Sequence, residues 1–73
     1  MSVAMPITMI RAGETGSIKR IVGNDDTMRR LEHMGFVLGE EVTVVTEMAG
    51  NLIVSVKDTR VALSKSLANK IIV

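Results

Sequence analysis

One helix end and two tight turns are compressed into the segment Arg29–Glu40, and this segment restricts the possible folds of the chain more than any other. Asp25 and Asp26 come shortly before it, where the partial positive charge of a helix N-terminus favours carboxylates. Gly35 stands where a helix commonly ends in a left-handed residue, and Phe36 follows at the position that packs back on the last turn. The segment therefore predicts a short helix with a defined end.

The spacing of apolar residues supports this helix. Met28, Leu31 and Met34 recur at every third position, which puts them on one helical face. We expect the helix to span Asp26–Met34 and a second turn to follow at Gly39, because glycine readily takes positive φ. The helix is thus wedged between stretches that are typical of strands.

Five stretches have the composition or the alternation of β-strands. They are Gly16–Val22, Glu41–Met48, Leu52–Val56, Arg60–Leu63 and Ile71–Val73. The first alternates imperfectly, and a bulge or a bend would resolve the irregularity. At the start of the chain, residues 1–6 are predicted to be a loose lead-in. A short apolar segment, Ile7–Ile10, follows them before the first strand.

Glu41–Met48 alternates best of the five stretches and predicts the first strand of a hairpin. We expect this strand to present four side chains on a common face: Val42, Val44, Thr46 and Met48. The connection Ala49-Gly50-Asn51 follows, with Gly50 and Asn51 able to take positive φ. Further along the chain, Ser64 is a suitable N-cap for one helical turn that ends at Ala68.

The order of elements indicates the fold class. Five short strands in 73 residues cannot cover both faces of an open sheet, whereas rolling into a small barrel buries one face and removes most edges. We predict a mainly β, SH3-like, partly open barrel over residues 1–73, as a single domain. One short α-helix lies between the first and second barrel strands, and a one-turn helix precedes the last strand. An OB-fold is the alternative, although it usually places its helix between the third and fourth strands.

Composition excludes several classes of protein. The chain is 47% hydrophobic with Phe36 as its sole aromatic residue, has a net charge of +1 and contains no cysteine. The near-neutral charge makes nucleic acid an unlikely partner, and the missing cysteines exclude disulfides and thiolate chemistry. A small secreted domain would more often carry disulfides, so the missing cysteines favour a cytoplasmic location. No apolar run reaches the length of a membrane span, so we expect no direct membrane insertion.

Several motifs, taken together and in order, resemble those of one known family. They are Gly13-Glu14-Thr15-Gly16-Ser17-Ile18, Arg30-Leu31-Glu32-His33-Met34-Gly35-Phe36-Val37-Leu38-Gly39, Arg60-Val61-Ala62-Leu63 and Ala68-Asn69-Lys70-Ile71-Ile72-Val73. The chain is similar to the FeoA family, the A component of bacterial ferrous-iron transport. The resemblance implies an SH3-like fold, a cytoplasmic location and no enzyme activity, and we expect no cofactor. It also implies partnership with the membrane ferrous-iron permease, which carries a GTP-hydrolysing domain.

Four residues form the predicted partner-binding surface: Arg29, Arg30, His33 and Val37. Arg29-Arg30 could form a small basic patch with Lys19-Arg20, and Val37 is the residue of the apolar run Phe36-Val37-Leu38 that we expect to be exposed, because consecutive side chains point different ways. Oligomeric state is left open by these patterns.

Metal binding is the alternative function, in which the chain is a transition-metal sensor or delivery protein. His33 is the only histidine, with Glu32, or Asp25 and Asp26, as companion ligands. A tight transition-metal site normally needs three or four converging donors, so we predict no metal site. Of the methionines, Met28, Met34 and Met48 are expected to face the core. A regulatory nucleic-acid accessory is a third hypothesis, which the near-neutral charge disfavours.

Overall fold

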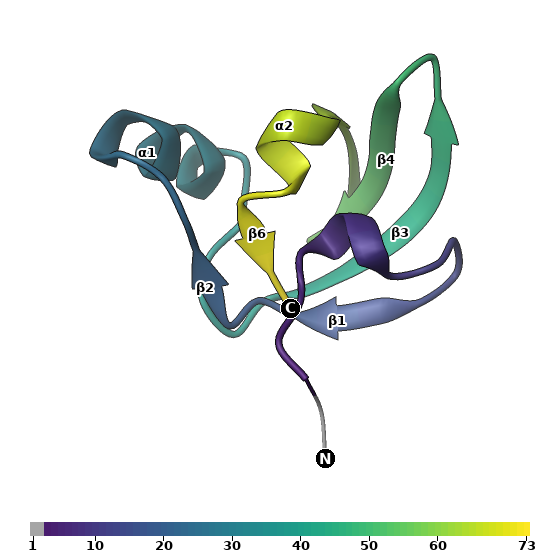
Figure 1. The fold of residues 1–73 in the computed structure, drawn as a ribbon, viewed down its shortest axis with the longest axis horizontal. Coiled ribbons are helices and arrows are strands. Elements are labelled where there is room, and N and C mark those ends of the chain that lie inside the picture. Colours follow the sequence, from purple (N-terminus) through teal and green to yellow (C-terminus); the bar gives the residue numbers. More distant parts are fainter. Residues whose placement is uncertain (1–2) are drawn as a thin grey trace.

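The computed structural model describes residues 3–73. In chain order its elements are η1 (Ile7–Met9, a 3₁₀-helix), β1 (Thr15–Ser17), β2 (Arg20–Ile21), α1 (Asp25–His33), β3 (Glu41–Met48), β4 (Asn51–Val56), β5 (Thr59–Ser64), α2 (Lys65–Ala68) and β6 (Ile71–Ile72). Figure 1 shows α1 at one end of the molecule, next to β2, and the long β3–β4 hairpin at the other.

Two antiparallel sheets build the fold. The larger has the strand order β1-β3-β4-β5, and the smaller pairs β2 with β6. The two sheets are not joined into a closed barrel. This arrangement confirms the mainly β, partly open architecture, with α1 in the connection before β3 and α2 directly before the last strand.

The expected strand Gly16–Val22 is divided between the two sheets, because β1 pairs with β3 and β2 pairs with β6. The change of partner falls at two adjacent residues. The backbone N–H of Ile18 donates to the carbonyl oxygen of Glu40 at 2.9 Å. The next N–H, of Lys19, donates to the carbonyl oxygen of Ile72 at 2.7 Å. The irregular alternation thus marks a bend, and the described chain has six strands where five were predicted.

β3 carries a bulge that contradicts one prediction. The register with β4 shifts between Val44 and Thr46, which leaves an extra residue in β3. Val42 and Val44 are buried, but Thr46 is exposed and the side chain of Met48 is 63% exposed. The predicted common face, and the predicted core position of Met48, were wrong because a bulge reverses the inward–outward alternation beyond it.

Each hairpin turn of the β3–β4–β5 meander has two residues at positive φ. Between β3 and β4 they are Ala49 (52°) and Gly50 (80°), whereas Asn51 already belongs to β4. Gly50 takes the positive φ that the sequence allows, whereas Asn51 does not, because it pairs within β4. Lys57 (50°) and Asp58 (62°) form the β4–β5 turn. Two consecutive positive φ values match the twist of the flanking strands.

Both α-helices begin at a side-chain cap. The Oδ1 atom of Asn24 accepts a hydrogen bond from the backbone N–H of Thr27 at 2.9 Å, and Asp25 and Asp26 occupy the first turn of α1. The predicted cap of α2 is confirmed, because the hydroxyl oxygen of Ser64 accepts a hydrogen bond from the backbone N–H of Leu67 at 3.3 Å. Such caps satisfy backbone donors that the helix itself leaves unpaired.

The end of α1 has the predicted geometry. The N–H of Phe36 donates to the carbonyl oxygen of Leu31, and the N–H of Gly35 donates to that of Glu32, both at 2.9 Å. Gly35 has a φ of 101°. These two bonds are those of a Schellman motif, which stops the helix and turns the chain back toward the core. α1 spans Asp25–His33, one residue earlier at both ends than predicted.

The core lies between the two sheets, α1 and α2. Phe36, Leu31 and Ile7 are fully buried. The other members of the cluster are Ile18, Val42, Val44, Leu52, Val54, Val56, Leu63, Ala68, Ile71 and Val73.

The described part of the lead-in is held against β6. Met5 exchanges two backbone hydrogen bonds with Val73, at 2.9 and 2.8 Å, and Pro6 forms an isolated bridge with Ile72. The prediction of a loose lead-in was therefore wrong for this part, because it covers the second edge of β6. Its first two residues, Met1 and Ser2, lie outside the described residues.

Candidate functional site

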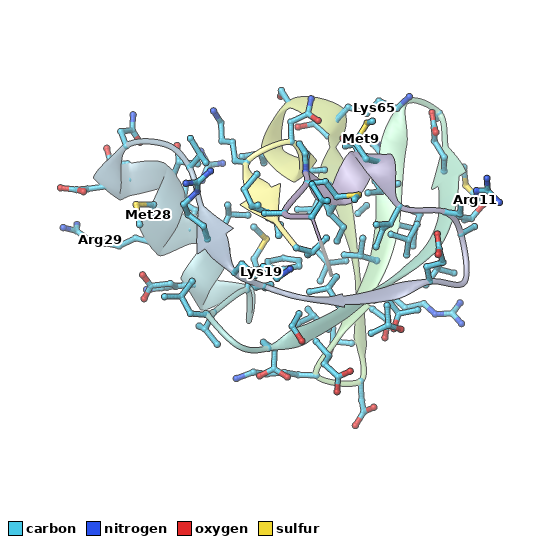
Figure 2. All side chains as sticks on the ribbon, turned by 60° about the horizontal axis from the view of Figure 1, so that its bottom comes forward. Met9, Arg11, Lys19, Met28, Arg29 and Lys65 are labelled. Carbon is cyan, nitrogen blue, oxygen red and sulfur yellow. The ribbon has the colours of Figure 1, made fainter. Side chains whose placement is uncertain are left out.

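Three of the four predicted contact residues meet on one side of α1. Arg29, Arg30 and His33 are exposed and line a shallow depression together with Met34. Arg29 and Arg30 stand one helical turn before His33, which is the spacing of neighbours on a helix surface. Figure 2 shows Arg29 pointing away from the body of the molecule, so this face of α1 is open to a partner.

Val37 lies outside that depression. It is half-buried and lines a separate groove between α1, β2 and the turn that follows α1. Phe36 is held inside by the end of α1, and the side chain of Leu38 is 69% exposed. The turn is closed by a 3.1 Å hydrogen bond from the N–H of Glu40 to the carbonyl oxygen of Val37, which leaves Leu38 at its tip. The expectation that Val37 is the exposed residue was therefore wrong.

The groove combines an apolar lining with charged rims. Its apolar side chains come from β2, α1 and the following turn: Ile21, Met28, Phe36, Val37 and Leu38. Lys19 and Arg20 line it on the β2 side, and Glu32 lines it on the α1 side. The suggested patch of Lys19-Arg20 with Arg29-Arg30 is therefore divided, since the two pairs line different depressions. Sequence reasoning missed Leu38 and Met28 as groove residues, although the apolar run after Gly35 was a usable signal.

Among residues 3–73, the cations of both depressions have no acidic partner within ion-pair distance. Within residues 3–73, ion pairs within 4.0 Å join Lys57 to Glu40, at 3.8 Å, and Lys65 to Glu47. Neither pair includes an arginine of α1 or a cation of the groove. These positive charges are therefore available to an acidic surface that approaches α1 or β2.

His33 has few potential co-ligands around it. Nowhere in the described part of the chain do three or more His, Cys, Asp or Glu residues come together in a group that could hold a metal ion. Transition-metal sites in proteins usually have three or four protein ligands, so the surroundings of His33 are poorly suited to a tight site. The surface around α1 combines exposed apolar side chains with positively charged ones.

The fold and these surfaces together define a small, mainly β protein with a partly open barrel and two depressions beside α1. Residues 5–73 match the family model of the FeoA domain. The chain therefore belongs to the FeoA family, whose proteins take part in ferrous iron transport. Among residues 3–73, no helix has both the length and the apolar character that crossing a bilayer requires.

Known relatives support the family and the fold. The chain is 32% identical over 68 residues to a Methanocaldococcus jannaschii protein provisionally named Fe(2+) transport protein A, covering 93% of this chain and 83% of that one. A crystal structure of an iron uptake regulatory protein, FeoA, superposes with a TM-score of 0.88 at 28% identity, over 97% of this chain and 95% of the other. The SH3-like fold is confirmed by FeoA of Stenotrophomonas maltophilia, a prokaryotic SH3 domain protein solved with zinc, with a TM-score of 0.77 at 29% identity over 96% of this chain and 87% of that one.

The same fold also occurs within longer proteins. A manganese-dependent transcriptional repressor superposes with a TM-score of 0.86 at 27% identity, over 96% of this chain but 40% of the repressor. The shared part is thus the SH3-like domain, and the remainder of the repressor has no counterpart among residues 1–73.

Proposed function

We propose that this chain is a non-enzymatic accessory protein of ferrous iron uptake that docks on the membrane ferrous-iron permease and its cytoplasmic GTPase domain. Membership of the FeoA family carries the proposal, together with a surface that is suited to binding. Docking would modulate transport, through GTP turnover or through assembly of the complex, and would take place in the cytoplasm.

The exposed face of α1 is the proposed contact. Arg29, Arg30 and His33 lie side by side there, and none of them forms an ion pair within the described part of the chain. Val37 adds apolar surface from the neighbouring groove. Positive charge of this kind favours a partner surface rich in carboxylates and raises the rate of encounter more than the final affinity.

Binding to the detergent-solubilised permease and to its isolated GTPase domain tests this proposal. The double variant Arg29→Glu/Arg30→Glu should bind about tenfold or more weakly, mainly through slower association at low salt. The matched control is Arg11→Glu/Lys65→Glu, which changes the net charge equally at exposed positions that lie away from α1 (Figure 2). The proposal would be refuted if the wild-type protein associated with neither partner and if deletion of this protein left ferrous iron transport unchanged. Equal weakening by both double variants would remove the α1 face as the contact.

The metal-binding alternative draws on one observation made on a relative, since FeoA of Stenotrophomonas maltophilia was solved with zinc. In this chain, His33 lacks the companion ligands that such a site needs among residues 3–73. Titration with ferrous or manganous ions decides between the two functions. Stoichiometric binding that His33→Ala weakens sharply would establish a sensor or delivery role.

A further inference from the structure

The groove beside α1 has an apolar lining that the protein itself leaves incompletely covered. Leu38 at its edge is 69% exposed, and Met28 and Val37 in its walls are half-buried. Methionine has a flexible, polarisable side chain that adapts its shape to a bound apolar group. A groove of this kind gains most from one inserted apolar side chain, which would cover Leu38 and Met28 together.

The charged side chains at the rims of the groove determine whether a positive or a negative ligand group is attracted to it. Lys19 and Arg20 contribute two positive charges from the β2 side, whereas Glu32 contributes one negative charge from α1. Within residues 3–73, none of these three groups takes part in an ion pair. The surplus is positive and lies along β2, so a carboxylate placed next to β2 is attracted, while a cation is repelled.

We propose that this groove receives a segment of the protein partner in which an apolar side chain inserts between Met28 and Leu38 while an adjacent carboxylate contacts Lys19 and Arg20. The inference rests on the proposed docking function and deepens it, because it names the chemistry of the partner segment and the surface that reads it. The apolar side chain supplies affinity by leaving water, and the charges fix the direction in which the segment lies.

Four variants measured by calorimetric titration against the isolated GTPase domain of the permease test the inference. Leu38→Gln should weaken binding about tenfold, which is typical for a central apolar contact, and Met48→Gln is its matched control at a similarly exposed apolar position. Lys19→Glu/Arg20→Glu should also weaken binding about tenfold, since the rim then repels the carboxylate. Glu32→Gln should leave binding unchanged or tighten it, because it removes the repulsive charge. Thermal unfolding of each variant checks that the fold is retained.

The outcomes separate the two proposals. If the wild-type protein binds and neither Leu38→Gln nor the β2 double variant weakens it, the groove is not the docking site, although the docking function stands. If Glu32→Gln weakens binding while the β2 double variant tightens it, the segment is basic and the inference fails. If Leu38→Gln abolishes self-association of this chain in sedimentation experiments, a second copy occupies the groove instead. If the wild-type protein does not bind at all, the docking function fails and the inference with it.

Discussion

At the scale of the residue, Gly16 is a position where the available space admits only glycine. It lies in β1 opposite Val42, and a Cβ atom added to it would lie 2.8 Å from the Cβ of Val73. Its backbone is not in the left-handed region. The need for glycine here therefore comes from the close approach of the Val73 side chain to the backbone of β1, rather than from backbone conformation.

Gly16→Ala should lower the free energy of unfolding by about 1–3 kcal/mol, because the new methyl group forces Val73 out of its place in the core. Urea denaturation measures the loss. Val73→Gly removes the Cβ atom that the methyl group would meet, so its own cost should be smaller in the Gly16→Ala background than in the wild-type protein. Additive costs would show that the two positions are not coupled and would contradict the explanation.

At the scale of the element, α1 is specified at both ends by local chemistry. The apolar face of α1 is narrow, because Leu31 is buried whereas Met28 and Met34 are half-buried. The boundaries of the helix are therefore set by its caps, with Asn24 at the N-terminus and Gly35 at the C-terminus. The position of α1 decides in turn where its exposed arginines and the adjacent groove lie.

Asn24→Ala should destabilise the protein by about 1 kcal/mol, since it removes the side-chain acceptor for the N–H of Thr27. Asn24→Asp keeps an acceptor and places a negative charge at the helix N-terminus, so it should retain the stability of the wild-type protein. The midpoint of urea denaturation compares the three proteins. No loss in Asn24→Ala would mean that the cap contributes nothing, and an equal loss in both variants would mean that a side-chain acceptor alone does not explain it.

At the scale of the whole molecule, the smaller sheet depends on segments that are distant in sequence. β6 has β2 on one side, and Met5 and Pro6 on the other. Figure 1 shows the first described residues running up to the end of β6. The lead-in thereby joins the sheet and shields an edge that would otherwise be open to pairing with another chain.

Removal of residues 1–6 should lower the free energy of unfolding by about 1–3 kcal/mol, because the two backbone hydrogen bonds between Met5 and Val73 are lost. Removal of residues 1–3 keeps both bonds and serves as the control. Urea denaturation gives the difference between the two truncated proteins. Equal stability of both would show that the pairing along β6 adds nothing to the fold.

The sequence alone determined the features that depend on neighbouring residues. The end of α1 at Gly35, the cap at Ser64 and the positive φ of Gly50 all follow from local backbone preference and side-chain spacing. The motifs carried by these elements also predicted the FeoA family, which the comparison of residues 5–73 confirmed.

Tertiary structure decided whatever depends on a partner far along the chain. The bend at Ile18 exists because the strand exchanges β3 for β6, and the bulge in β3 depends on its register with β4. Likewise, Val37 and Leu38 differ in exposure because the turn that carries them docks on the core through Phe36. Sequence spacing specifies which side chains can share a face, but packing against distant segments determines which face is covered and which remains free to bind.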